Sequence, residues 1–131
     1  VAEEKLEMVG LIDKADSLAS QLTLAERKRL EFAKSLATDP EILLLDEVNA
    51  GLNQTEIQSA ISLIQKVRDQ GVTVLIIEHL MKVIMDLSDR VIVLHHGEKI
   101  AEGAPREVTG DEQVIKAYLG EKYVAMMEKL N

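Results

Sequence analysis

The amino-acid sequence predicts an α/β fold in which helices flank a mostly parallel sheet. A continuous apolar run at 42–45 and a run rich in β-branched residues at 72–77 have the composition of strands that are buried on both faces. The segment between them carries apolar residues at helical spacing over 57–67 and ends at Gly71. Alternation of strands and helices is typical of parallel sheets with right-handed crossovers.

The residues before the first strand are predicted to be helical. A short helix covers 2–9, and a weaker helical turn covers 13–20. Thr23 begins a stronger helix, because Glu26 follows it at the spacing of a capping box, and Pro40 ends this helix. Its predicted apolar face consists of Leu30, Phe32, Ala33, Leu36 and Ala37.

The remaining elements follow from local signals. Asn53 and Glu56 repeat the capping spacing at the start of the helix between the two strands. The later elements are a helix over 80–87, a strand over 90–94, a hairpin turn at His96 and Gly97, a strand over 99–101, a helix that begins at Pro105, and two helices over 111–119 and 121–130.

The composition excludes several classes of protein. The chain has 131 residues, of which 47% are hydrophobic, so it can form a packed core. Its net charge of −8, with one Phe and two Tyr as the only aromatic residues, argues against nucleic-acid binding. The chain has no Cys, which excludes a disulfide scaffold and a thiolate metal site. No apolar run approaches the roughly 20 residues of a membrane span, and the N-terminus does not resemble a signal peptide, so we expect a cytoplasmic location.

Ionisable residues follow both apolar strands. Asp46 and Glu47 end the first strand, and Glu78 and His79 end the second. Ligands of parallel sheets bind beyond the carboxyl ends of the strands, where one carboxylate can hold Mg²⁺ and another can accept a proton from attacking water. A His on the neighbouring strand end can reach a phosphoryl group. The alternative is that buried strands simply end in polar residues, but two such pairs together favour a functional site.

Thr23 offers a second possible phosphate contact, because a helix N-terminus has free backbone N–H groups. The alternative is that Thr23 and Glu26 form only a capping box, and these two residues by themselves favour it.

In order and spacing, these motifs resemble the ATP-binding subunits of ABC transporters over essentially the whole chain. The segment 22–26 resembles the signature motif, and the helix 27–33 resembles the signature helix that follows it. The segment 42–47 resembles the Walker B strand with its catalytic glutamate. The segment 50–53 resembles the D-loop, and His79 is similar in position to the switch histidine. The segments 50–53 and 114–120 are most similar to the ATP-binding subunits of branched-chain amino-acid importers.

This resemblance implies a RecA-like P-loop NTPase core that lacks its P-loop half. Residues 1–40 would be part of the helical subdomain with the signature helix, 41–110 the second half of the ATPase core, and 111–131 C-terminal helices. The implied function is ATP hydrolysis that drives amino-acid import, at the inner face of the cell membrane. The implied partners are membrane-spanning transporter subunits and a second ATPase subunit.

The resemblance also implies a role for each motif. Asp46 would place Mg²⁺, Glu47 would activate water, and His79 would sense the γ-phosphate. Two segments would act across a head-to-tail dimer: Thr23, Leu24, Ala25 and Glu26 would face ATP bound to the opposite subunit, and Ala50, Gly51, Leu52 and Asn53 would contact the same interface.

Several family features are absent or altered. None of the seven glycines is followed by Lys, so the chain has no P-loop, and we expect it neither to bind ATP and Mg²⁺ tightly nor to hydrolyse ATP by itself. In the signature, Leu24 and Ala25 replace glycines and Glu26 replaces glutamine, so Glu26 would repel a γ-phosphate unless it turns back to cap Thr23. Val48 replaces the family's usual proline.

Two other functions stay open at this point. The chain could be a non-enzymatic assembly module that uses this half-domain for protein contacts, or an ABC-type ATPase of DNA repair, although the net charge and the lack of coiled-coil heptads count against the latter. Because a sheet without its P-loop strand has unpaired edges, we also expect the isolated chain to form a homo-oligomer. His95 and His96 are expected to be turn residues rather than metal ligands.

Overall fold

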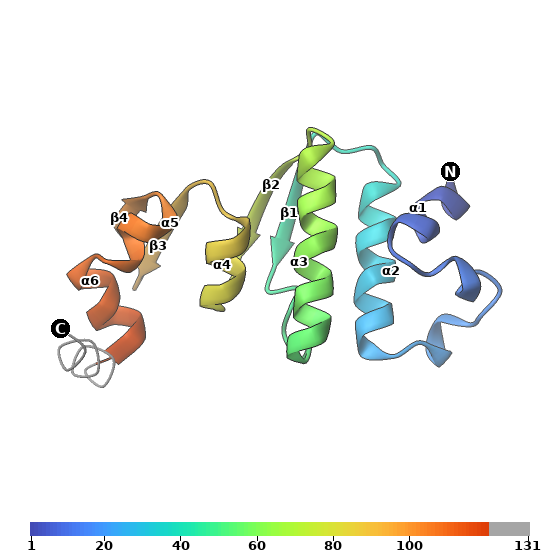
Figure 1. The fold of residues 1–131 in the computed structure, drawn as a ribbon, viewed down its shortest axis with the longest axis horizontal. Coiled ribbons are helices and arrows are strands. Elements are labelled where there is room, and N and C mark those ends of the chain that lie inside the picture. The colour runs from blue at the N-terminus through green and yellow to red at the C-terminus, as the bar shows by residue number, and fades with distance from the viewer. Residues whose placement is uncertain (121–131) are drawn as a thin grey trace. The chain divides into compact units, whose positions relative to one another are not determined.

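A computed structural model describes residues 1–120, which belong to two compact units. The first unit is Val1–His79, and the second begins at Leu80. Figure 1 labels their helices and strands in chain order. The predicted helix over 121–130 lies outside the described residues. Within residues 1–120, no helix is long and apolar enough to cross a membrane.

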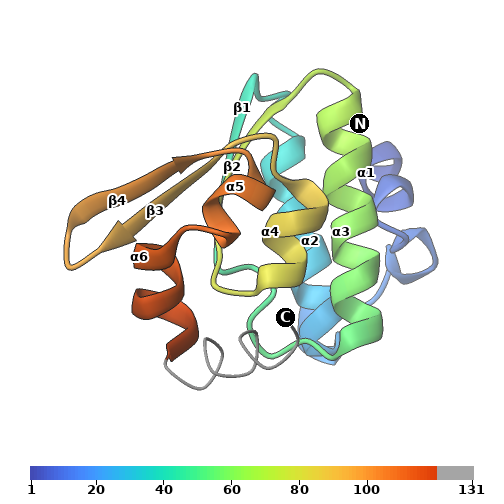
Figure 2. The ribbon, with the colours of Figure 1, turned by 60° about the vertical axis from the view of Figure 1, so that its left-hand side comes forward.

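The first unit packs helices against a small parallel sheet. Its elements are α1 (Ala2–Met8), two 3₁₀ turns at Ile12–Lys14 and Ala19–Gln21, α2 (Leu24–Leu36), β1 (Ile42–Asp46), α3 (Gln54–Asp69) and β2 (Thr73–Ile77). The weak helical turn predicted over 13–20 therefore consists of two separate 3₁₀ turns. In Figures 1 and 2, α2 and α3 lie side by side on one side of the sheet.

Capping boxes begin both long helices, as predicted. In α2, the backbone N–H of Glu26 donates to Thr23 Oγ1 (3.2 Å), and the backbone N–H of Thr23 donates to Glu26 Oε2 (2.8 Å). Asn53 and Glu56 make the same pair of bonds at the start of α3, both at 2.9 Å. Each box satisfies two N–H groups that a helix start leaves without a partner.

Helices α2 and α3 supply about half of the core of the first unit. Helix α1 packs against α2, and Val9, Leu11 and Ala33 form a buried cluster between them. Along α3, Ile61, Ile64 and Val67 are buried at the predicted helical spacing. Of the predicted apolar face of α2, Ala33 and Leu36 are buried, whereas Ala37 is exposed.

The parallel pairing of β1 and β2 is as predicted, but their burial is not. Leu44 pairs with Leu75, and Asp46 pairs with Ile77. Leu43 and Leu45 are buried, whereas the alternate side chain of Leu44 is 70% exposed. The prediction that these strands are buried on both faces is therefore wrong for the described residues, because α2 and α3 cover only one side of the sheet (Figure 2). We call the four exposed aliphatic residues on the other side, Ile42, Leu44, Leu75 and Ile77, the open sheet face.

The second unit contains an antiparallel hairpin among short helices. Its elements are α4 (Met81–Leu87), β3 (Val91–His95), β4 (Glu98–Gly103), α5 (Pro105–Thr109), α6 (Glu112–Val114) and a π-helical turn at Ile115–Leu119. Val93, Val108 and Val114 form its buried cluster.

The hairpin confirms the predicted turn. His96 (φ 49°) and Gly97 (φ 80°) both adopt the left-handed conformation that two-residue hairpin turns favour. This turn places β4 beside β3, and the two strands pair antiparallel in a two-stranded sheet. In the described residues, the mostly parallel sheet is reduced to the pair β1 and β2.

Candidate functional site

The structure brings Glu47 and His79 together at the carboxyl ends of β1 and β2. His79 Nδ1 lies 3.7 Å from Glu47 Oε1. Both side chains are open to solvent, with 62% of the His79 side chain and 56% of the Glu47 side chain exposed. Asp46, the last residue of β1, is exposed in the same strand end. A carboxylate and an imidazole therefore lie within reach of the same ligand.

Glu47 occupies an unusual backbone conformation. Its φ is 48°, in the left-handed region that residues with a Cβ rarely adopt. Its backbone N–H donates to the carbonyl of Ile77 in β2 at 2.9 Å. This bond extends the pairing of β1 with β2 by one residue and fixes where the chain turns.

A buried amide next to this turn binds the other strand end. The Asn49 side chain is only 1% exposed, and its Nδ2 donates to Glu78 Oε1 at 2.7 Å. The backbone N–H of Asn49 donates to the same oxygen at 3.4 Å. Among the described residues, Asn49 Oδ1 and Glu78 Oε2 have no hydrogen-bond partner. The sequence analysis did not single out Asn49, although an amide two residues after the strand-end carboxylates is a polar residue that needs a partner.

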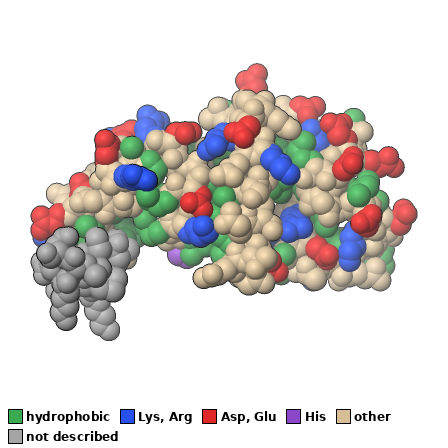
Figure 3. Space-filling view, viewed as in Figure 1, with side chains coloured by type: hydrophobic (Ala, Val, Ile, Leu, Met, Phe, Trp, Pro, Cys, Tyr) green, Lys and Arg blue, Asp and Glu red, His purple; other side chains and the backbone are tan. Residues whose placement is uncertain are grey.

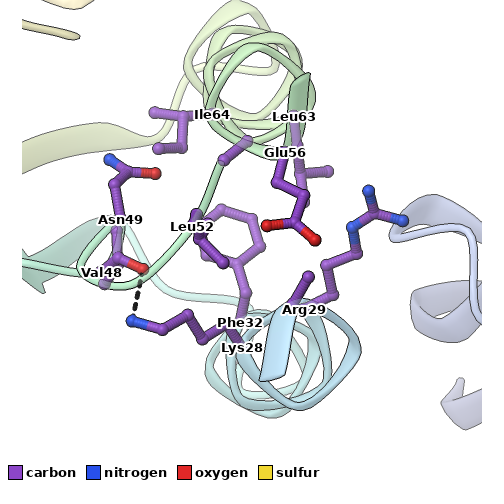
Figure 4. A pocket seen from close by; sticks show the side chains of 11 residues that line it. Lys28, Arg29, Phe32, Val48, Asn49, Leu52, Glu56, Leu63 and Ile64 are labelled. Atoms are coloured by element: carbon purple, nitrogen blue, oxygen red, sulfur yellow. Dashed lines mark hydrogen bonds between the residues drawn. The ribbon is translucent and has the colours of Figure 1, made fainter. Parts of the chain in front are cut away.

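A lysine from α2 also reaches this turn. Lys28 Nζ donates to the backbone carbonyl of Val48 at 2.9 Å, as the dashed line in Figure 4 shows. Lys28 lines a small pocket between α2 and α3, together with Val48 and Asn49. Phe32, Leu52 and Ile64 make up much of the apolar wall of this pocket (Figure 4). At this pocket, α2 contacts the residues that follow Glu47.

At the start of α2, the segment Thr23, Leu24, Ala25 and Glu26 is accessible. Thr23 and Leu24 are exposed. The hydrogen bond from the backbone N–H of Thr23, with the nearby Lys14 ammonium (3.4 Å), lowers the pKa of the Glu26 carboxyl. The Glu26 carboxylate is therefore turned back onto Thr23, where it occupies the Thr23 N–H.

The segment Ala50, Gly51, Leu52 and Asn53 leads from the strand end into α3, where Asn53 is the N-cap. Gly51 has φ 80°, and a Cβ at this position would lie 3.0 Å from Leu24 Cδ2. The structure therefore places this segment against the start of α2. The backbone N–H of Ala50 donates to the Glu47 carbonyl at 3.2 Å, so this segment is bonded directly to the strand-end turn.

Across residues 1–120, no three His, Asp or Glu side chains are arranged to hold a metal ion by themselves. Mg²⁺ in nucleotide sites is commonly bound by only one or two carboxylates together with substrate phosphates. Asp46 fits that donor set, because it is an exposed carboxylate at the end of a strand. On the face of the first unit in Figure 3, acidic and basic side chains are interspersed, so this face has no continuous basic surface.

Comparison with known proteins agrees with the motifs. Residues 98–124 match a family model described as a branched-chain amino acid ATP-binding cassette transporter. Over 117 residues, the chain is 44% identical to the high-affinity branched-chain amino acid transport ATP-binding proteins LivG of Escherichia coli strain K12 and BraF of Pseudomonas aeruginosa strain PAO1. The chain matches the C-terminal part of ABC transporter ATP-binding proteins. Each alignment covers 88% of this chain and 46% of the relative, so the chain spans about half the length of the curated relatives it matches.

Solved structures of ABC transporter proteins have the same fold. The ADP conformation of MJ1267, an ATP-binding cassette of an ABC transporter, is 29% identical in sequence and superimposes with a TM-score of 0.84. The match covers 92% of this chain and 49% of that one. The resemblance inferred from the motifs is therefore confirmed, and so is an α/β fold with small parallel and antiparallel sheets.

Proposed function

We propose that this chain provides the C-terminal part of the ATP-hydrolysing subunit of a branched-chain amino-acid ABC importer. The observation that carries the proposal is the pairing of Glu47 with His79 at the carboxyl ends of two parallel strands. It is supported by the 44% identity to two ATP-binding proteins of branched-chain amino-acid transport. The fold proposed for the complete subunit is a RecA-like core, of which this chain forms the half without the P-loop.

Each strand-end residue has a proposed task. Glu47 accepts a proton from the attacking water, and a positioned base of this kind contributes about 10²–10⁴-fold to the rate. His79 lies beside Glu47 and contacts the γ-phosphate. Asp46 holds Mg²⁺, which neutralises charge on the phosphates when it is bound.

Two exposed segments are proposed to face ATP on a second ATPase subunit. Thr23, Leu24, Ala25 and Glu26 lie at the N-terminus of α2, where backbone N–H groups attract anions. Ala50, Gly51, Leu52 and Asn53 pack beside them through Gly51 and Leu24. Membrane-spanning subunits complete the proposed assembly at the inner face of the cell membrane.

The test joins this chain to a P-loop. A chimera in which the chain replaces the matching residues of Escherichia coli LivG is assayed for ATP hydrolysis with and without Mg²⁺. We expect Mg²⁺-dependent turnover that falls by about 10²-fold or more in Glu47→Gln. Glu41→Gln, which neutralises an exposed carboxylate just before β1, is the matched control and should leave turnover unchanged.

Two outcomes would contradict these proposals. Turnover of the chimera that is unaffected by Glu47→Gln would exclude Glu47 as the base. Metal-dependent hydrolysis by the 131-residue chain alone, abolished by Glu47→Gln, would refute the expectation that it needs a P-loop.

The open sheet face supports a second proposal, that the isolated chain self-associates. Leu44 and Leu75 are exposed and directly opposite each other on β1 and β2. Exposed apolar residues next to an unpaired strand edge favour pairing with another chain. Light scattering of the wild-type chain should report a dimer or a larger species. The Leu44→Lys variant should shift this equilibrium toward the monomer. A wild-type chain that is monomeric at high concentration would contradict this proposal.

A further inference from the structure

The backbone of Glu47 is held from three directions. Its own N–H is bonded to the Ile77 carbonyl of β2 at 2.9 Å. The carbonyl of the next residue, Val48, accepts from Lys28 Nζ of α2 at 2.9 Å. The residue after that, Asn49, is bonded to Glu78 through both its side chain (2.7 Å) and its backbone N–H (3.4 Å).

These bonds oppose a specific strain. A residue with a Cβ at φ 48° is in a sparsely populated conformation, which persists only where the surroundings over-determine it. If the chain relaxed to negative φ, the direction of the Glu47 side chain would change and its 3.7 Å approach to His79 would be lost. The strain therefore has to be opposed by neighbours, and Lys28, Asn49 and Glu78 make hydrogen bonds with the residues that follow Glu47.

The chemistry of these bonds suits the task. Lys28 and Glu78 are charged, so their hydrogen bonds are of the stronger, charge-assisted kind. Both bonds are partly buried, and Asn49 is almost completely buried, so water competes with them little. The bonds come from two different elements, α2 and the end of β2, and act on the two residues that follow Glu47.

We infer that Lys28 and Glu78 are positioning residues: through Val48 and Asn49 they hold Glu47 in its left-handed conformation beside His79. The inference rests on the proposed function only in the role that it gives to Glu47. The position of Glu47 itself is measurable in this chain without nucleotide.

The experiment is NMR on the 131-residue chain. The three-bond HN–Hα coupling and the Cα and Cβ shifts of Glu47 report its φ, and amide hydrogen exchange reports its bond to Ile77. In Lys28→Met and in Glu78→Ala we expect the coupling and shifts to move away from left-handed values. Exchange of the Glu47 N–H should be about tenfold faster or more, as expected when a charge-assisted bond is removed from a locally opening segment.

Conservative variants separate positioning from general stability. Glu78→Gln keeps an acceptor for Asn49, and Lys28→Arg keeps a donor for Val48, so both should restore the Glu47 signals. Asp39, another non-glycine residue with positive φ, is the internal control whose coupling should not change. Lys34→Met removes the exposed pair of Lys34 with Glu31 and is the matched control for Lys28→Met.

The outcomes are distinct from those of the hydrolysis assay. If the Glu47 coupling and shifts stay unchanged in folded Lys28→Met and Glu78→Ala, the positioning role is wrong even if the chimera hydrolyses ATP. If they change while the chimera is inactive, the positioning role stands and the proposed function fails. Should either variant not fold, the milder Lys28→Gln and Glu78→Asp are judged by the same signals.

Discussion

Removal of the buried Asn49 amide should destabilise the first unit by about 2 kcal/mol. The Asn49 side chain is 1% exposed and gives the Glu78 carboxylate a hydrogen bond of 2.7 Å. A hydrogen bond to a charged group contributes about 1.5–3 kcal/mol. Asn49→Ala leaves Glu78 Oε1 with only the 3.4 Å bond from the backbone N–H, so most of that contribution is lost.

Urea unfolding followed by far-ultraviolet circular dichroism measures this cost. With a slope of about 1–3 kcal/mol per molar urea, the midpoint should fall by about 1 M. Gln58→Ala, at an exposed amide on α3, is the matched control and should change stability by less than about 0.5 kcal/mol.

A double-mutant cycle assigns the cost to the pair. Asn49→Ala and Glu78→Ala should be strongly non-additive, because each single variant already removes the same bond. If Asn49→Ala unfolds at the wild-type midpoint, or if the two single effects simply add, the hydrogen bond between Asn49 and Glu78 does not contribute this stability.

Three further predictions concern the start of α2 and the segment beside it. Thr23→Ala removes the Oγ1 acceptor of the capping box and should cost about 1 kcal/mol in urea unfolding, whereas Thr23→Ser should cost much less. The pKa of the Glu26 carboxyl is lowered below 4.5 in the folded chain, so the ionised carboxylate stabilises the fold above that pH. This stabilisation should disappear as the pH falls below about 4.5. In Glu26→Gln, the free energy of unfolding should therefore decrease less over the same pH range. Gly51→Ala should cost more than about 1 kcal/mol, because φ is 80° and the new Cβ would lie 3.0 Å from Leu24. Gly71 also has positive φ but has open space around it, so Gly71→Ala should cost less unfolding free energy. When Leu24→Ala is combined with each glycine variant, the unfolding free energies lost by Gly51→Ala and by Gly71→Ala should be closer to each other.

Signals confined to a few neighbouring residues predicted the local structure well. The capping spacings of Thr23 with Glu26 and of Asn53 with Glu56 located the starts of α2 and α3, and His96 with Gly97 located the hairpin. Each of these signals acts through hydrogen bonds or φ values within four residues, so the rest of the chain does not alter it.

Burial was harder to predict than secondary structure. The run 42–45 indicates that both faces of β1 are apolar, but it does not indicate whether other elements cover both faces. Leu44 is exposed although its neighbours Leu43 and Leu45 are buried. In the same way, the alternation of strands and helices predicted a parallel neighbour for β3. The strand that the turn at 96–97 places beside β3 is β4, and it is antiparallel.

The site was predicted only in part, because sequence patterns do not reveal contacts between residues that are distant in the chain. The rule for strand ends predicted that Glu47 and His79 belong to one site, and the structure brings them together. Lys28 with Val48 and Asn49 with Glu78 are separated by 20 and 29 residues, and neither pair belongs to a short motif. Only the packing of α2 and β2 around the Glu47 turn makes these contacts, so no periodicity or spacing could reveal them. The roles proposed for Glu47, His79 and Asp46, for the segment at 23–26 and for the segment at 50–53 all stay predictions.

The left-handed backbone of Glu47 has a consequence for the evolution of this chain. Glycine adopts φ near 48° without the penalty of roughly 1–2 kcal/mol that a Cβ brings, so Glu47→Gly should cost the fold little and can even stabilise it. Selection for stability alone would therefore favour glycine at this position. Under the role proposed for Glu47, this chain gives up conformational stability for a carboxylate next to His79. Libraries screened only for thermostability should accordingly enrich glycine at position 47, and libraries screened for activity should remove it.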